Sequence, residues 1–104
     1  MAEPDGRMTP AYWVAQVRVH DRAGYTAYRA AAAAPIAAAG GRLLVLGGAP
    51  EVVAGTMAPE TVIVEFPSLA AARACYHGAG YQATLAGRDA AAEVSLAIVE
   101  GHAG

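Results

Sequence analysis

The sequence contains no lysine and no asparagine, and it has a single cysteine, a single tryptophan and a single phenylalanine. Its seven cationic residues are all arginines and its formal net charge is −2. Because no basic stripe is present to neutralise phosphates, we expect no nucleic-acid partner. The lone Cys75 excludes an intrachain disulfide and a cysteine metal cluster, and it is typical of a cytoplasmic protein. No stretch approaches the ~20 apolar residues of a membrane span, so no membrane partner is expected.

What is present is mostly apolar. Hydrophobic residues make up 56% of the 104 positions and charged residues 15%, which predicts one globular domain. We expect residues 1–10 to form a flexible leader, residues 11–101 the domain, and residues 102–104 a tail. The abundance of alanine suggests a bacterial genome. A chain this short buries only about two-thirds of the surface that its unfolded form exposes, so self-association would stabilise it.

Hydrophobic alternation and helix start signals predict the order β-α-β-β-α-β. Asp21 and Ser68 are expected to cap the two helices, because their oxygens can accept hydrogen bonds from the first helical turn. We expect strands at 12–19, 42–46, 61–66 and 94–100, a short hairpin arm at 51–54, and helices at 22–39 and 69–91, the second interrupted at Gly78 and Gly80. This order predicts an α+β, ferredoxin-like fold, in which both helices cover one face of a four-stranded antiparallel sheet.

The uncovered face of this sheet, called here the open face, must meet water or another surface. Alternation assigns to it Tyr12, Val14, Gln16 and Arg18 from the first strand, and Thr61, Ile63 and Glu65 from the third. Monomers rarely leave such an apolar patch bare, so we expect a homodimer in which two open faces pack together. This dimer would enclose Glu65, and a buried carboxylate would need an arginine partner.

The second strand is ambiguous because both of its faces are apolar. If Leu43 and Val45 face the helices, then Arg42, Leu44 and Leu46 join the open face. The placement of Arg42 beside Glu65 therefore stays open.

Several segments resemble the DUF1330 family, a group of dimeric α/β-barrel proteins of unknown function. The matching segments are YWVAQVRV from Tyr12, D-x-x-x-Y-x-x-Y from Asp21, GGRLLVLGG from Gly40, VEFPSLAAARACYH from Val64, and IVEG from Ile98, with Tyr81 and Arg88. The resemblance implies the ferredoxin-like fold and the face-to-face dimer, but little chemistry.

The sequence also departs from this family pattern. Leu46 stands where an arginine usually precedes Gly-Gly, Ala54 replaces a usual glutamate, and Gly78-Ala79-Gly80 replaces Ser-x-Glu. Each change removes a polar group near the presumed site, so the resemblance implies a specialised member with a more apolar pocket.

Glu65 is the strongest candidate for chemistry. Partial burial beside Arg18 or Arg42 would suit it as a general base that removes a proton next to a carbonyl, with the arginine clamping an anion. The alternative is a structural ion pair at the dimer interface. His20 and His77 are candidates for a second proton carrier, since histidine changes charge near neutral pH. The alternative for each is a surface or helix-end histidine.

The remaining candidates would bind the substrate. Tyr25, Tyr28, Tyr76 and Tyr81 form a group on the two helices, of which Tyr76 and Tyr81, with Gln16, are the candidates for contact with a small-molecule ligand; packing is the alternative. The three histidines lack metal-ligand spacing, so no metal is predicted, and no cofactor motif is present.

The sequence therefore favours a cofactor-independent enzyme that acts on a small organic molecule by proton transfer, as an isomerase, cyclase or dehydratase does, in bacterial secondary metabolism. Two alternatives stay open: a non-catalytic small-molecule-binding or accessory dimer, and a cofactor-free oxygenase. Fold-level analogy alone supports the enzymatic hypotheses.

Overall fold

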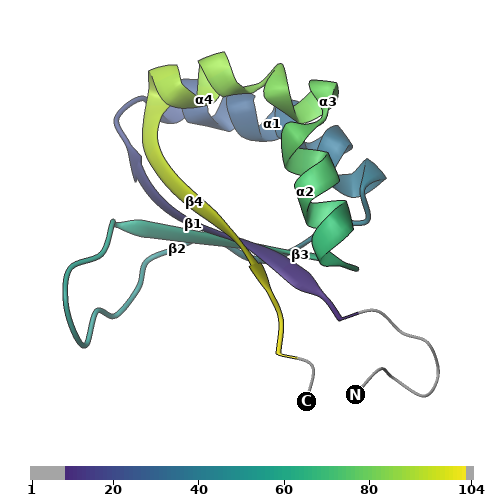
Figure 1. Ribbon diagram of the computed structural model, residues 1–104. Coiled ribbons are helices and arrows are strands. Elements are labelled where there is room, and N and C mark those ends of the chain that lie inside the picture. The colour runs from purple at the N-terminus through teal and green to yellow at the C-terminus, as the bar shows by residue number, and fades with distance from the viewer. Residues whose placement is uncertain (1–8, 103–104) are drawn as a thin grey trace.

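The computed structural model describes residues 9–102, so most of the expected leader and tail lies outside the described residues. Figure 1 shows a twisted sheet with the helices layered on one of its faces. The elements are β1 (Ala11–Val19), α1 (Arg22–Ala38), β2 (Arg42–Gly48), β3 (Glu60–Phe66), α2 (Leu69–His77), α3 (Ala79–Gln82), α4 (Leu85–Ala91) and β4 (Ala92–Glu100). The strands pair antiparallel in the order β2-β3-β1-β4. The predicted ferredoxin-like α+β fold is confirmed.

The helices begin where the sequence places their caps. Asp21 Oδ1 accepts from the backbone N–H of Gly24 at 3.1 Å, and Ser68 Oγ accepts from that of Ala71 at 3.0 Å. The second predicted helix is divided into α2, α3 and α4, and residues 51–54 form no strand. None of the helices in the described part of the chain combines the length and the apolar character that crossing a membrane requires.

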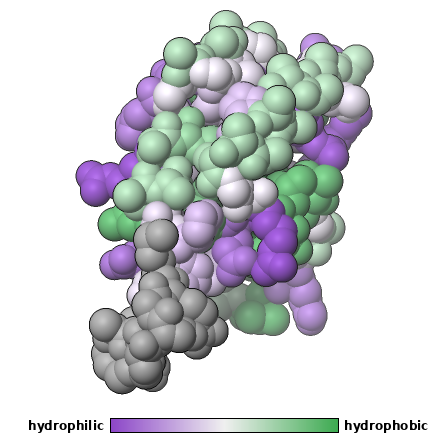
Figure 2. Space-filling view, turned by 90° about the vertical axis from the view of Figure 1, so that its right-hand side faces the viewer, coloured by the Kyte–Doolittle hydropathy of each residue, from purple (hydrophilic) through white to green (hydrophobic). Residues whose placement is uncertain are grey.

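The core lies between the sheet and the helices. Alternate residues of β1 and β3 point to the helices and are almost completely buried, namely Ala11, Trp13, Ala15, Val17, Val64 and Phe66. The Trp13 ring packs at an angle against the rings of Phe66 and Tyr81. Its indole N–H donates to the carbonyl of Ala72 at 3.0 Å, which anchors α2 on the sheet. Figure 2, which views the molecule from the side where α2 and α3 lie, shows a mostly weakly hydrophobic surface over these helices, as their many alanines predict.

The second strand differs from the expected pattern. Leu43 pairs with Val64 on the helix side, but a register shift follows it, so that Val45 pairs with Ile63 and Leu46 with Val62. Because a shift by one residue exchanges the two faces of a strand, Leu46 faces the helices and Val45 the open face. The condition under which Leu46 would share the open face with Arg42 is therefore not met, because only Leu43, and not Val45, faces the helices.

Candidate functional site

The open face carries the predicted carboxylate. Glu65 lies on β3 opposite Tyr12 of β1 and Arg42 of β2. Arg42 Nη2 donates to Glu65 Oε1 at 2.7 Å, and the Tyr12 hydroxyl donates to Oε2 at 3.3 Å, so both carboxylate oxygens are engaged. The Arg42 side chain is 72% exposed and that of Glu65 is 25% exposed. In a single chain this is a surface ion pair, which contributes little to stability.

Gln16 and Arg18 lie farther along β1, beside a separate hollow of about 310 Å³ that Met57 and Glu93 also line. The Gln16 side-chain oxygen accepts from the backbone N–H of Ala58 at 2.8 Å. At ~3.3 Å per strand residue, Arg18 is roughly 20 Å along the strand from Tyr12. The structure therefore pairs Glu65 with Arg42 and not with Arg18.

The two candidate histidines do not join Glu65 within one chain. His20 is exposed just beyond β1, at the end of the strand that is far from Tyr12. His77 is exposed at the end of α2, in the helix layer on the other side of the sheet, with its ring against that of Tyr76. A proton relay between Glu65 and either histidine is therefore not assembled within one chain.

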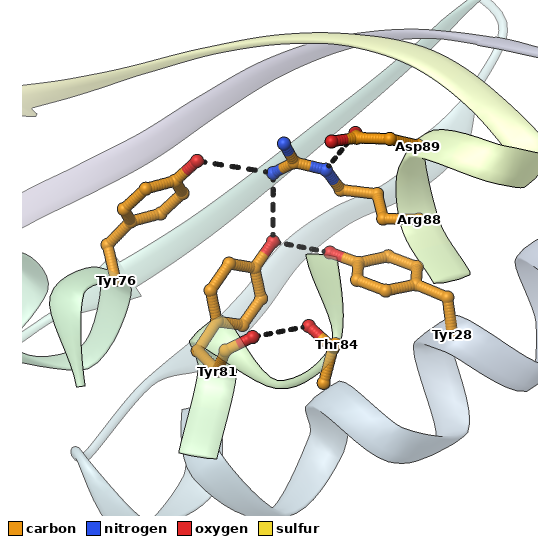
Figure 3. Close-up of polar contacts among 6 residues, drawn as sticks. All are labelled: Tyr28, Tyr76, Tyr81, Thr84, Arg88 and Asp89. Carbon is orange, nitrogen blue, oxygen red and sulfur yellow. Dashed lines mark hydrogen bonds and ion pairs between the residues drawn. The ribbon is translucent and has the colours of Figure 1, made fainter. Parts of the chain in front are cut away.

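Tyr76 and Tyr81 lie on the helix side, where they surround Arg88 (Figure 3). Tyr81 is completely buried and Arg88 is 8% exposed. Arg88 Nη1 lies 3.4 Å from the hydroxyl oxygen of each tyrosine, and its Nε donates to Asp89 Oδ1 at 2.9 Å. The Tyr81 and Tyr28 hydroxyl oxygens are 2.6 Å apart. We call Tyr28, Tyr76, Tyr81 and Arg88 the arginine–tyrosine cluster.

The electrostatics of this cluster are well defined. Burial alone would lower the pKa of Arg88, but hydrogen bonds to Asp89, Tyr76 and Tyr81 outweigh burial and leave that pKa raised. Burial, and then the hydrogen bond with Tyr81, raises the pKa of Tyr28 far above that of an ordinary phenol. At neutral pH the cluster therefore consists of a cationic guanidinium and a neutral Tyr28 phenol.

Tyr28 also lines a cavity of about 500 Å³ between α1 and the sheet. The backbone of α1 lies closer to α3 and α4 than to the strands beneath it, and the cavity occupies the space between α1 and the sheet. Its walls are mostly apolar, with Trp13, Val62, Val64 and Leu96 from the sheet and Ala32, Ala33 and Ile36 from α1. Leu43 and Leu46 of β2 line it as well and are about half exposed, so the cavity opens toward β2.

A few polar groups interrupt these apolar walls. They belong to Tyr25, Thr26, Tyr28 and Arg29, all on α1. Burial raises the pKa of Tyr25, so its phenol also stays neutral. Among the described residues that line the cavity there is no carboxylate and no imidazole. Within residues 9–102 there is also no group of three or more histidine, cysteine or acidic side chains placed to bind a metal ion.

The family model described as "Domain of unknown function (DUF1330)" matches residues 10–102, which is nearly the whole chain. The chain belongs to the DUF1330 family. A comparison with curated proteins gave no match.

Solved structures share the fold of this DUF1330 chain. The RPA0582 protein of unknown function from Rhodopseudomonas palustris is 20% identical with a TM-score of 0.72, and the match covers 92% of this chain and 85% of that one. SnoaB, a cofactor-independent oxygenase from Streptomyces nogalater, is 16% identical with a TM-score of 0.64, over 92% of this chain and 96% of that one. At these identities the likeness establishes the fold alone.

Sequence reasoning overlooked two features of this DUF1330 chain: the cavity under α1 and the role of Arg88. A usable signal for Arg88 was its spacing, because Tyr81, Thr84 and Arg88 fall three and four residues apart, as residues on one helix face do. An arginine on the same face as a buried tyrosine indicates a buried polar cluster. No comparable signal marks the cavity, since its walls come from five separate elements.

Proposed function

We propose that this DUF1330 chain is a cofactor-independent enzyme that acts by proton transfer on a small, mostly apolar organic molecule held in the cavity under α1. The cavity is the observation that carries the proposal. Its volume of about 500 Å³ lies within the roughly 300–1,000 Å³ of typical small-molecule sites, and it combines apolar walls with a few polar groups, as such sites do.

The cavity is a better substrate site than the surroundings of Glu65. Arg42 and Tyr12 engage both oxygens of Glu65, so within one chain neither oxygen is left open toward a substrate. Glu65 also lies on the open face, whereas the cavity lies on the helix side. We propose that Glu65 forms an ion pair at the interface. A catalytic role for Glu65, His20 or His77 stays a prediction.

A second candidate activity is cofactor-free oxygenation. The described cavity lining offers hydrogen-bond donors but no carboxylate or imidazole base, so it suits a substrate that loses its proton without a protein base. The similarity in fold to SnoaB, a cofactor-independent oxygenase, adds support at the level of analogy. A non-catalytic ligand-binding protein would use the same cavity, so measurement of turnover must distinguish these three functions.

We further propose that the protein is a homodimer through its open faces and that it acts in the bacterial cytoplasm. Val14, Ile63 and Val45 are only partly buried on the open face, and Val99 is 47% exposed. Packing a second copy against them would remove this apolar surface from water and would exclude solvent from the Glu65–Arg42 pair. The free thiol of Cys75 suits a reducing compartment.

The function can be tested by filling the cavity. Ala33 of α1 lines the cavity, whereas Ala31, also exposed on α1, does not. With a panel of small aromatic ketones and phenols, NMR would measure binding and the exchange of C–H protons in D₂O. The wild type and Ala31→Phe should bind the ligand with the same affinity and exchange its protons at the same rate. In Ala33→Phe both the affinity and the exchange rate should fall by about tenfold or more, because the new ring occupies the cavity.

Each other outcome assigns a different function. Exchange that survives Ala33→Phe but falls by ~10²-fold in Glu65→Gln would move the site to the open face. Ligand binding without turnover would indicate a binding protein, and oxygen consumption that depends on ligand would indicate an oxygenase. Binding that Ala33→Phe leaves unchanged would contradict the proposed site.

A further inference from the structure

The arginine–tyrosine cluster ends at the wall of the cavity. Its members come from four helices: Tyr28 from α1, Tyr76 from α2, Tyr81 from α3 and Arg88 from α4. Of these, Tyr28 lines the cavity, and Tyr81 and Arg88 lie behind it, shielded from solvent. Figure 3 shows the hydroxyls of Tyr28 and Tyr81 directed at each other and Arg88 above them. The cluster is thus a polar chain that runs from a buried cation to the cavity.

The direction of the hydrogen bonds along this chain follows from the donors available. A guanidinium can only donate, so Tyr81 accepts from Arg88. If Tyr28 donated to Tyr81, the hydroxyl proton of the completely buried Tyr81 would have no acceptor within the cluster. A buried donor without an acceptor costs free energy. The favoured order is therefore that Arg88 donates to Tyr81, and Tyr81 donates to Tyr28 across 2.6 Å.

In this order the proton of Tyr28 has no acceptor within the cluster. Tyr28 borders the cavity, so a bound molecule can supply that acceptor. Each donor in such a chain polarises the next, so a cation at its far end makes Tyr28 a stronger donor than an isolated phenol. The charge itself stays behind the wall, because Arg88 does not line the cavity.

We propose that the Tyr28 hydroxyl is the binding point for the carbonyl or enolate oxygen of an otherwise apolar cavity ligand, with Tyr81 and Arg88 as positioning residues. This inference rests on the proposed function and adds the substrate class: a small, mostly hydrocarbon ketone or phenol with one oxygen at the α1 wall. A donor held ready where negative charge develops stabilises an enolate more than the neutral ketone, so the arrangement makes the C–H next to the carbonyl more acidic. Because the described lining holds no carboxylate or imidazole, the proton passes to water at the open side of the cavity.

A matched pair of probes tests this binding point. 2-Tetralone has a carbonyl oxygen, and tetralin is a hydrocarbon of nearly the same shape. Calorimetry would give the Kd of each probe, and emission from Trp13, the single tryptophan and a residue of the cavity wall, would show that the probe occupies the cavity. The ¹³C chemical shift of the bound carbonyl would report a hydrogen bond donated to it. If the cluster were purely structural, substitutions in it would not change this shift.

We expect the wild type to prefer 2-tetralone to tetralin by about threefold to tenfold, the effect of one hydrogen bond. Tyr28→Phe should remove this preference and the downfield carbonyl shift, and Tyr81→Phe should reduce both. The control is Tyr12→Phe, since Tyr12 lies on the open face and does not line the cavity, and it should change neither. Tyr25→Phe, which alters a cavity tyrosine outside the cluster, tests the alternative binding point. Because Arg88→Leu could unfold the chain, the conclusion depends on the tyrosine variants.

The possible failures are distinct. If both probes bind the wild type and Tyr28→Phe with equal affinity, the binding point is wrong and the cavity proposal stands. If Tyr25→Phe removes the preference instead, the binding point lies at Tyr25. If neither probe binds the wild type or changes the emission of Trp13, both the binding point and the proposed cavity site are overturned.

Discussion

Tyr81→Phe is the variant for which the structure gives the clearest expected magnitude. Tyr81 is completely buried, and the substitution keeps the ring and its contact with Trp13 while it removes only the hydroxyl. The lost hydrogen bond with Tyr28 is short and neutral, worth about 0.5–1.5 kcal/mol. The contact with Arg88 is long, at 3.4 Å, and Arg88 keeps Asp89 and Tyr76 as acceptors, so it adds only a little.

Together these losses should lower the free energy of unfolding by about 1–2 kcal/mol. For a domain of about this size, each 1 kcal/mol shifts Tm by about 4–8 °C. Urea unfolding followed by Trp13 emission, with all variants at one protein concentration because association would add stability, provides the measurement. Tyr25→Phe is the control, because the structure gives Tyr25 ring contacts with Tyr28 and Arg22 and no hydroxyl hydrogen bond among the described residues.

The reasoning would be refuted if the free energy of unfolding of Tyr81→Phe lay within about 0.5 kcal/mol of the wild-type value, which is the usual range for neutral substitutions. It would also fail if Tyr25→Phe were as destabilising as Tyr81→Phe. Either result would mean that the arginine–tyrosine cluster is a set of packed rings whose hydroxyls add no stability.

Two glycines and the open face give the remaining predictions. A Cβ on Gly41 would lie 2.6 Å from Ile36 Cγ2, and one on Gly87, inside α4, would meet nothing within 4 Å. In urea unfolding, Gly41→Ala should therefore lower the free energy of unfolding by about 1–3 kcal/mol. Gly87→Ala should raise it by about 0.5–1 kcal/mol. Equal effects of the two substitutions would contradict the packing around Gly41. Val14→Arg places a charge at the centre of the open face, so sedimentation should find a dimer for the wild type and for Ala31→Arg but a monomer for Val14→Arg. A monomeric wild type at micromolar concentration would contradict the proposed dimer.

The parts of the fold that depend on local pattern were predictable. The alternation in β1 predicted that Trp13 and Val17 face the helices, and both are almost completely buried. Asp21 and Ser68 were recognised as caps because a side-chain oxygen before an apolar periodic segment satisfies free N–H groups of the first turn. These features were readable because they depend on residues only a few positions apart.

The candidate site was predictable only in part. Glu65 does lie on the open face with an arginine beside it, as its parity in β3 predicted, and that partner is Arg42. His20 and His77 were grouped with Glu65 by residue type, but strand length and the two sides of the sheet separate them. The register shift after Leu43 was also unreadable, because both faces of β2 are apolar and either pairing satisfies the pattern.

The order of the elements and the ferredoxin-like fold follow from the amino-acid sequence, since hydrophobic period and capping residues act over short distances. The cavity and the arginine–tyrosine cluster, by contrast, are properties of the folded chain. The cavity depends on how far α1 stands from the sheet, and the link from Arg88 to Tyr28 depends on α1, α3 and α4 meeting at one point. Such distances are set by the packing of whole elements against one another, and no spacing within the chain encodes them.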